Sequence, residues 1–185
     1  MAKIALLLID IQNDYFPEGK FPLAGIEAAA AQAARLLAIA RDKGLAVVHV
    51  RHEAPEADAG FFGNGTEGAR IHPRVAPREG ETVIVKQKVN SFLNTDLDDV
   101  LKREGVSDLV IVGAMSHMCV DAATRAALDL GYGATVVQDA TATRDLSFAG
   151  AAVPAAQVQT TMLAALAFAG ADIVPATQVA SDWSA

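Results

Sequence analysis

Three side chains that could form a catalytic site follow apolar, strand-like runs of the sequence. Asp10 ends the run KIALLLID, Lys86 ends TVIVK, and Cys119 lies just beyond DLVIVG. If these runs are parallel strands of one sheet, the three side chains lie at its carboxyl edge, where open α/β sheets bind their ligands. A thiol, a carboxylate and an ammonium group can act together as a nucleophile, a base and an orienting cation.

Each of these residues alone has a simpler interpretation. Cys119 is the only cysteine, and we expect it at the start of a helix, where free N–H groups and the helix dipole lower the pKa of a thiol. A lone cysteine is about as often a small buried apolar residue. Asp10 could be a general base, a loop-fixing residue or a metal ligand, and Lys86 alone reads as a solvated strand end. Their shared position at strand ends favours the catalytic interpretation.

Strand-like and helix-like runs alternate along the whole chain, which predicts a single domain of residues 1–185 with a parallel sheet covered on both faces. Thr95 is expected as the N-cap of one helix, with Asp98 placed for a capping box. We expect strands at 3–10, 45–50, 82–86, 108–113, 134–139 and 172–174, and helices at 25–43, 95–105, 118–131 and 155–169.

The segment 51–81 breaks this alternation. It is rich in glycine and proline, and loops of this length inside a domain are usually functional or disordered. Its GFFGNG stretch carries Phe61 and Phe62, which either pack into the core or line a pocket or an oligomer contact.

Composition narrows the class of protein. The formal net charge is −7 and no basic stripe is present, which argues against nucleic acid as the main partner. A single cysteine forms no internal disulfide, which is typical of a reducing, cytoplasmic setting. The N-terminal MAKIALLLIDIQNDYF meets acidic residues within ten positions, so we expect neither a signal peptide nor a membrane partner.

Three blocks of the sequence resemble the motifs of the isochorismatase-like cysteine hydrolases, the family related to nicotinamidase and N-carbamoylsarcosine amidohydrolase. They are LLLIDIQNDYF, VIVKQKVNSFLNTDLDDVL and LVIVGAMSHMCVDAATRAALDLGYGATVVQDATAT. The blocks occur in order over nearly the whole chain, and the third is the most specific. The resemblance implies a three-layer α/β/α fold with a six-stranded parallel, Rossmann-like sheet of strand order 3-2-1-4-5-6.

The resemblance also implies a catalytic triad of Asp10, Lys86 and Cys119. In the family, the cysteine attacks a carbonyl carbon, the aspartate passes a proton to the leaving amine, and water cleaves the resulting thioester. The backbone N–H groups of Met115 and Cys119 would form an oxyanion hole, with a cis peptide bond between Ala114 and Met115. Because the third strand lies two positions from the first, Lys86 needs its full length to reach Asp10.

Departures from the family pattern bear on the substrate, which we expect to be a small molecule. The stretch VRHEAPEAD carries His52 but lacks the Asp-x-His metal motif of nicotinamide-cleaving members, and His72 is distant, so we expect no metal and no other cofactor. Isochorismate hydrolysis cleaves a vinyl ether and needs no thiol. Cys119 therefore favours an amide, carbamoyl or lactam C–N bond. Ser116 replaces a common threonine, and Gln159 a histidine of the most similar subgroup.

Further residues are candidates for the substrate pocket or for oligomer contacts. His117 is either an exposed loop residue or a proton relay, Gln12 and Asp14 are expected to fix a loop, and Trp183 either packs on a neighbouring subunit or frays. Family members are commonly homodimers or homotetramers. The alternatives to a C–N hydrolase are a catalytically silent α/β binding module, a vinyl-ether hydrolase and a redox-responsive thiol protein. The pocket candidates are Phe16, His52, Phe61, Phe62, Asn90, Phe92 and His117.

Overall fold

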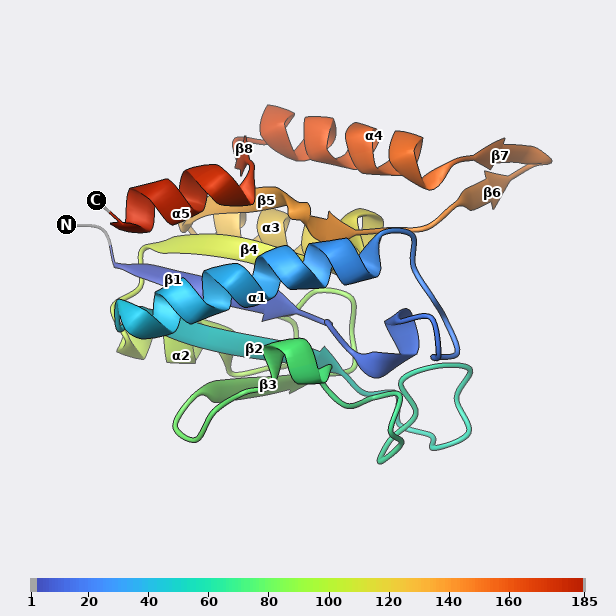
Figure 1. The fold of residues 1–185 in the computed structure, drawn as a ribbon, viewed down its shortest axis with the longest axis horizontal. Coiled ribbons are helices and arrows are strands. Elements are labelled where there is room, and N and C mark those ends of the chain that lie inside the picture. The colour runs from blue at the N-terminus through green and yellow to red at the C-terminus, as the bar shows by residue number, and fades with distance from the viewer. Residues whose placement is uncertain (1–2, 185) are drawn as a thin grey trace.

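The structure is a computed structural model that describes residues 3–184. Its centre is a six-stranded parallel sheet of order β3-β2-β1-β4-β5-β8, covered by helices on both faces (Figure 1). This is the strand order expected from the sequence, because β6 and β7 form a separate antiparallel hairpin. The strands are β1 (Ile4–Ile9), β2 (Ala46–His52), β3 (Thr82–Lys86), β4 (Asp108–Ala114), β5 (Gly133–Ala142), β6 (Leu146–Phe148), β7 (Ala151–Val153) and β8 (Asp172–Val174).

Helices α1 and α5 pack on one face of the sheet, and α2 and α3 on the other. None of the helices in residues 3–184 is long and apolar enough to span a membrane. The α-helices are α1 (Ile26–Asp42), α2 (Leu97–Arg103), α3 (Asp121–Asp129), α4 (Ala155–Phe168) and α5 (Ala176–Ser184), and the short helical turns are η1 (Asn13–Tyr15), η2 (Pro73–Val75) and the π turn η3 (Ser116–Val120).

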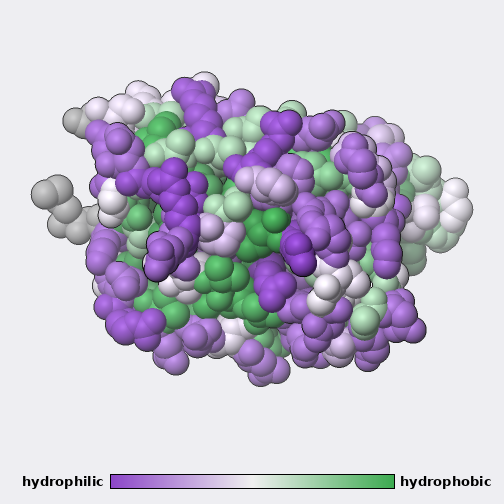
Figure 2. Space-filling model, turned by 60° about the horizontal axis from the view of Figure 1, so that its bottom comes forward, coloured by the Kyte–Doolittle hydropathy of each residue, from purple (hydrophilic) through white to green (hydrophobic). Residues whose placement is uncertain are grey.

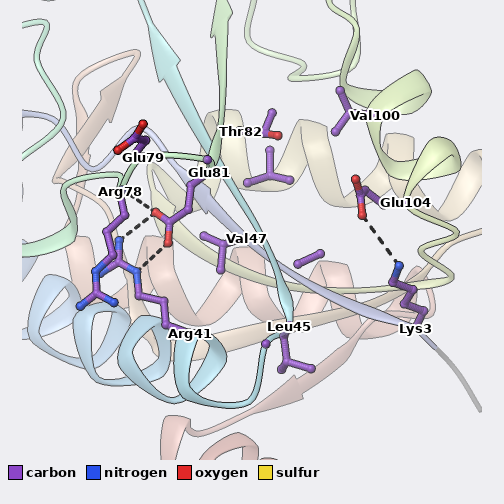
Figure 3. A pocket seen from close by; sticks show the side chains of 14 residues that line it. Lys3, Arg41, Leu45, Val47, Arg78, Glu79, Glu81, Thr82, Val100 and Glu104 are labelled. Carbon is purple, nitrogen blue, oxygen red and sulfur yellow. Dashed lines mark hydrogen bonds and ion pairs between the residues drawn. The ribbon is translucent and has the colours of Figure 1, made fainter.

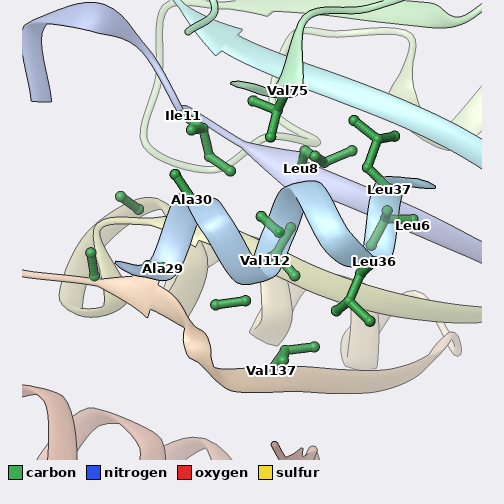
Figure 4. Close-up of a cluster of buried hydrophobic side chains, with 14 of the residues drawn as sticks. Leu6, Leu8, Ile11, Ala29, Ala30, Leu36, Leu37, Val75, Val112 and Val137 are labelled. Atoms are coloured by element: carbon green, nitrogen blue, oxygen red, sulfur yellow. The ribbon is translucent and has the colours of Figure 1, made fainter. Parts of the chain in front are cut away.

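The apolar run of β1 is continuous because both of its faces are buried. Leu6 and Leu8 point toward α1, and the cluster they form there is drawn in Figure 4. Leu7 and Ile9 point to the opposite face, toward α2 and α3. A strand buried on both faces places its last residues deep in the molecule. Asp10, which follows directly, is therefore fully buried.

Local details differ from the expectations at two helix starts. Helix α2 begins at Leu97 rather than Thr95, because Asp96 is the N-cap and the Thr95 hydroxyl only accepts a 3.4 Å hydrogen bond from the Leu97 N–H. Asp98 forms no capping box, since its carboxylate accepts hydrogen bonds from Lys102 and Tyr132. The helix expected at 118–131 begins earlier, with the π turn η3.

Two elements near the C-terminus were not expected. One is the β6–β7 hairpin, and the other is α5, which carries Trp183. Trp183 is neither part of a frayed end nor exposed for packing on a neighbouring subunit. Its side chain is buried in the same apolar cluster as α1. The prediction for this residue was wrong because the apolar face of α5 covers the sheet beside α1 (Figure 1).

The long segment between β2 and β3 is irregular, as expected, and two buried side chains hold it. The Gln12 amide donates to the carbonyl oxygens of His52 at 2.8 Å and Ala69 at 2.7 Å. The Asp14 carboxylate accepts from the Phe62 N–H at 2.7 Å. The prediction that Gln12 and Asp14 fix a loop is therefore confirmed.

A cavity of about 450 Å³ lies at the amino ends of β2 and β3, opposite the edge that carries Asp10 (Figure 3). Its charged groups largely pair with each other. Glu81 accepts hydrogen bonds from the Arg41 guanidinium at 2.7 and 2.8 Å and from the Arg78 N–H at 2.8 Å, and it lies 3.0 Å from His49 Nε2. Other residues that line the cavity are Lys3, Leu45, Val47, Thr82 and Glu104.

This cluster predicts a loss of stability in acid. Hydrogen bonds from Arg41 outweigh burial and lower the pKa of Glu81 from 4.5 to about 2. Because the pKa is lower in the folded protein, ionised Glu81 stabilises the fold at any pH above the pKa of the unfolded chain, about 4.5. This stabilisation is lost as the pH falls from about 4.5 to about 2. After discounting for solvent screening, we expect Glu81→Gln to lower the free energy of unfolding by about 2 kcal/mol at pH 7.

Urea unfolding of both proteins at pH 7, 4 and 2.5 measures this effect. The difference between them should shrink as the pH falls. A difference that stays constant across this range would show that Glu81 acts by packing rather than by charge.

Candidate active site

The ends of β1, β3 and β4 bring an aspartate, a lysine and a cysteine into contact. Lys86 Nζ lies 2.8 Å from Asp10 Oδ2 and donates a 3.2 Å hydrogen bond to Cys119 Sγ. Asp10, Lys86 and Cys119 are buried, with relative exposures of 0%, 1% and 6%. The Lys86 side chain therefore extends from β3 past the end of β2 and reaches Asp10 at the end of β1.

The backbone around Asp10 explains how its carboxylate comes to lie there. Its N–H still bonds to the Val50 carbonyl at 2.9 Å, as if β1 continued, but its φ of 51° is left-handed and ends the strand. On the other side, β4 approaches closely because Gly113 has no side chain. A Cβ at Gly113, whose φ is +125°, would collide with the Ile9 carbonyl oxygen. This close approach places the turn with Cys119 beside Asp10.

The turn between β4 and α3 presents backbone N–H groups as well as the thiol. The peptide bond between Ala114 and Met115 is cis, as the resemblance implied. The Met115 carbonyl accepts from the N–H groups of Met118 at 3.0 Å and Val120 at 3.2 Å, whereas the Met115 N–H donates no hydrogen bond among the described residues. That N–H is therefore free to bind an oxygen atom of a ligand.

Gln159 supports this turn from α4. Its side-chain oxygen accepts from the Ser116 hydroxyl, and its amide nitrogen donates to the Thr141 hydroxyl at 2.7 Å. The Ser116 hydroxyl also lies 3.2 Å from the Ala142 carbonyl. Gln159 thus ties η3 to the end of β5, and it acts on the cysteine turn through Ser116.

The thiol is not acidified in the way that a helix start suggested. Burial raises the pKa of Cys119, the Asp10 carboxylate raises it further, and Lys86 lowers it only in part. Burial also works against a charged lysine, but Asp10 and Cys119 outweigh it and raise the pKa of Lys86. The resting site therefore holds an ammonium group and a protonated thiol beside the Asp10 carboxylate.

Two aromatic or imidazole side chains extend this cluster. His52 Nδ1 lies 3.2 Å from Lys86 Nζ, so the expected pocket residue His52 does reach the site. Sequence reasoning did not single out Tyr15, yet burial raises the pKa of its hydroxyl, and the charges of Asp10 and Cys119 raise it further. The signal that could have found it is its place in the turn directly after Asp10.

Three further pocket candidates, all phenylalanines, pack against other aromatic rings or an imidazole. Phe62 packs edge-on against Tyr15, with ring centroids 4.6 Å apart, and Phe61 packs beside it against Phe21. Phe16 stacks on His72 at 3.6 Å, and both line a separate cavity of about 510 Å³.

Of the last three candidates, Asn90 and Phe92 lie in the segment between β3 and α2, and His117 lies in the turn η3 that carries Cys119. Asn90 caps its own loop by accepting from the Phe92 N–H, and the Phe92 ring packs against Tyr132. His117 is half-buried and its Nδ1 lies 2.6 Å from the hydroxyl of Thr143, the residue after β5, so its ring is held against the protein rather than extended into solvent. These contacts place Asn90 and Phe92 in loop and core packing.

Within residues 3–184, no group of three or more His, Cys, Asp and Glu side chains is arranged to hold a metal ion. Asp10 lies instead against a lysine ammonium group, which excludes a cation from the same side.

Comparison with known proteins identifies the family. The isochorismatase domain matches residues 4–173. The isochorismatase family protein YddQ of Bacillus subtilis is 52% identical over 162 residues, which cover 88% of this chain and 90% of YddQ. Maleamate amidohydrolase of Pseudomonas putida is 36% identical over 152 residues, which cover 74% of this chain and 71% of that enzyme. A crystal structure from Oleispira antarctica, described as an isochorismatase hydrolase, matches with a TM-score of 0.94 and 54% identity over 97% of this chain and 96% of its own. The chain therefore belongs to the isochorismatase family of hydrolases.

Proposed function

We propose that this protein is a cysteine hydrolase that cleaves a C–N bond of a small amide, carbamoyl or lactam compound through a thioester on Cys119. The observation that carries the proposal is the buried contact of Lys86 Nζ with both Asp10 Oδ2 and Cys119 Sγ. A buried ion pair next to a thiol is costly to maintain for packing alone, and a protein that merely kept the fold would have no need of it.

In the first half of the reaction, sulfur attacks the substrate carbonyl carbon and the thiol proton passes to Asp10. The carbonyl electron pair moves onto oxygen, and the oxyanion accepts hydrogen bonds from the backbone N–H groups of Met115 and Cys119. When the intermediate collapses, the C–N bond breaks and the leaving nitrogen takes the proton from Asp10. Ammonia or an amine departs, and an acyl thioester remains on Cys119.

In the second half, water attacks the thioester and gives a proton to Asp10. The C–S bond breaks, the sulfur recovers that proton, and the acid product leaves. Lys86 stays protonated throughout, because the neighbouring Asp10 and Cys119 raise its pKa. Its fixed positive charge stabilises the negative charge that develops on sulfur.

The substrate class follows from the nucleophile and from the relatives. A vinyl ether has no carbonyl carbon at which a thiol could form a thioester, so Cys119 favours C–N substrates. Maleamate amidohydrolase, at 36% identity, acts on an amide. The protonated resting thiol also suits a mechanism in which Asp10 takes the proton during attack. All seven pocket candidates, His52 included, stay predictions for substrate contact.

A direct test measures ammonia release from maleamate, ureidoacrylate, N-carbamoyl amino acids and simple lactams. Acid quenching during turnover, followed by intact-mass measurement, should reveal a mass increase equal to the acyl group. Digestion should locate that group on Cys119. Turnover without any covalent intermediate on Cys119 would contradict the thioester mechanism.

We also propose that the protein is a homo-oligomer, for which α4 and the β6–β7 hairpin supply the observation. Helix α4 contains no charged residue and buries little more than Val158 and Leu166. The hairpin projects beyond the rest of the fold (Figure 1), and both of its strands are exposed. Phe148 and Phe168 are 85% and 96% exposed. Large exposed apolar surfaces of this kind mark interfaces.

The opposite edge of the sheet has a different surface. Figure 2 shows this β3 side, where hydrophilic residues surround an apolar patch near the centre of the view. Phe148→Ser combined with Phe168→Ser is therefore expected to lower the molar mass measured by light scattering on a gel-filtration column to that of a smaller assembly. Val83→Ser on β3, where Val83 is 39% exposed, is the matched control and should leave the mass unchanged. A wild-type protein that elutes as a monomer would contradict the proposal.

Residues 1–185 are proposed to act as one hydrolase domain. The single cysteine favours a reducing, cytoplasmic setting, in which Cys119 stays available as a thiol.

A further inference from the structure

We propose that His52 is a positioning residue that holds the Lys86 ammonium group in its catalytic orientation. This inference rests on the proposed function, because the orientation matters only if Lys86 acts on Asp10 and Cys119. The family resemblance assigns no role to this histidine, and the sequence placed it only among the pocket candidates.

A lysine ammonium group has three N–H donors, and three acceptor atoms surround it here. Lys86 Nζ lies 2.8 Å from Asp10 Oδ2, 3.2 Å from Cys119 Sγ and 3.2 Å from His52 Nδ1. Because Lys86 is 1% exposed, water cannot replace a missing partner. Three acceptors fix rotation of the ammonium group about its last bond, whereas two would leave one buried N–H unsatisfied.

His52 accepts this hydrogen bond only in one protonation state. Burial lowers the pKa of His52, and the Lys86 charge lowers it further. The ring is therefore neutral at pH 7. Since Nδ1 faces an ammonium group that can only donate, the ring proton must sit on Nε2.

The surrounding chain holds the imidazole at this position. His52 pairs with Lys86 across the β2–β3 ladder, and the Glu53 N–H donates to the Lys86 carbonyl at 2.9 Å. Gln12 fixes the His52 backbone on both sides, since its amide accepts from the His52 N–H and donates to the His52 carbonyl, each at 2.8 Å. Phe62 packs near the ring, with centroids 6.1 Å apart. A residue clamped this way suits the orientation of a neighbour.

Two variants of nearly equal size distinguish the role of the Nδ1 acceptor from that of the volume of the ring. In His52→Asn, the side-chain oxygen occupies roughly the place of Nδ1 and can accept from Lys86, whereas His52→Leu fills the same space without an acceptor. The readout is the rate of Cys119 alkylation by iodoacetamide at pH 8.5, followed by intact mass, which needs no substrate. Loosening Lys86 weakens its hold on the thiolate, so the rate should fall about 5-fold in His52→Leu and stay within about 2-fold in His52→Asn.

The kinetic constants provide a second readout on any amide that is hydrolysed. We expect kcat to fall about 10-fold in His52→Leu with KM within about 3-fold, and His52→Asn to recover most of kcat. Equal effects of the two variants on alkylation, or no effect of either, would overturn the proposal. If the asparagine and leucine variants differ as expected but no amide is turned over by the wild type, the His52 assignment stands and the proposed function fails.

A measurement on the unmodified protein guards against variants that fail to fold. Nitrogen-15 NMR of the histidine rings at pH 7.5 should find His52 neutral, with hydrogen on Nε2 and a bare Nδ1. A proton on Nδ1 would overturn the assignment, because that nitrogen could then accept nothing from Lys86.

Discussion

Asp10→Asn is expected to lower amide turnover at least about 1,000-fold while making Cys119 easier to alkylate. The two effects have opposite directions because Asp10 has two separate influences on the thiol. As a base it accepts the thiol proton during attack, and asparagine cannot do so. As a buried negative charge it raises the pKa of Cys119, and asparagine removes that charge while Lys86 still lowers the pKa.

In the wild type, burial and Asp10 hold the pKa of the thiol above its ordinary value, so alkylation should become fast only above the free-thiol midpoint of about 8.5. In Asp10→Asn the midpoint should move to lower pH. Alkylation with iodoacetamide between pH 6 and 10.5, followed by intact mass, measures both midpoints, and ammonia release measures turnover.

The matched control is Asp129→Asn, which removes the same charge from an exposed position on α3. It should leave both turnover and the midpoint unchanged. Thermal unfolding must first show that Asp10→Asn is folded at the assay temperature, because Lys86 then lacks its buried partner. A midpoint that moves upward would contradict the charge arrangement described here. Turnover that survives would remove Asp10 from the role of base.

This outcome would also distinguish the hydrolase from a redox-responsive thiol protein. Such a protein depends on thiolate, so a variant with more thiolate would respond faster to oxidant and lose nothing. A hydrolase instead gains thiolate and loses turnover, because a thiolate without a proton for the leaving nitrogen cannot expel an amine efficiently. Wild type and Asp10→Asn together thus give different patterns for the two classes of protein.

The sequence predicts best the strands that form continuous apolar runs. The run TVIVK gives β3 with the bounds of the structure, Thr82–Lys86, and the apolar runs of β1 and β4 fall within one residue of theirs. Buried parallel strands are continuous apolar runs, and their ends coincide with the first polar residue. For that reason Asp10, Lys86 and the turn with Cys119 could be assigned to one edge of the sheet.

Features that depend on depth or direction could not be predicted in the same way. The helix start suggested an acidic thiol, but the pKa of Cys119 is set mainly by burial, and depth is a property of the packed fold. Tyr15, the last residue of the helical turn η1, is within range of the Asp10 charge, whereas Phe16, directly after that turn, stacks on His72. Each strand of the β6–β7 hairpin has only three residues, all exposed. The sequence there therefore shows no alternation of apolar and polar residues that would predict a strand.

Cys119→Ser is expected to abolish turnover, by at least about 10,000-fold, with little change in the fold. Serine keeps a polar atom within reach of the Lys86 ammonium group and removes only a small buried volume, so we expect unfolding temperatures close to that of the wild type. A hydroxyl loses its proton far less readily than a thiol, and Asp10 is too weak a base to remove it. Burial, which already raises the pKa of the thiol, opposes an alkoxide even more strongly.

Cys119→Ala completes the test, because it removes the nucleophile and leaves the oxyanion-hole backbone in place. Ammonia release should match the uncatalysed background in both variants, and neither should gain the acyl mass seen on quenched wild type. Ammonia release that persists in Cys119→Ser would assign the attack to a water molecule activated by Asp10. A wild type that releases no ammonia yet binds amides as tightly as Cys119→Ala would instead favour a binding module. The buried contact of Lys86 with Asp10 and Cys119 argues for the first set of results, since binding alone requires no proton acceptor beside a thiol.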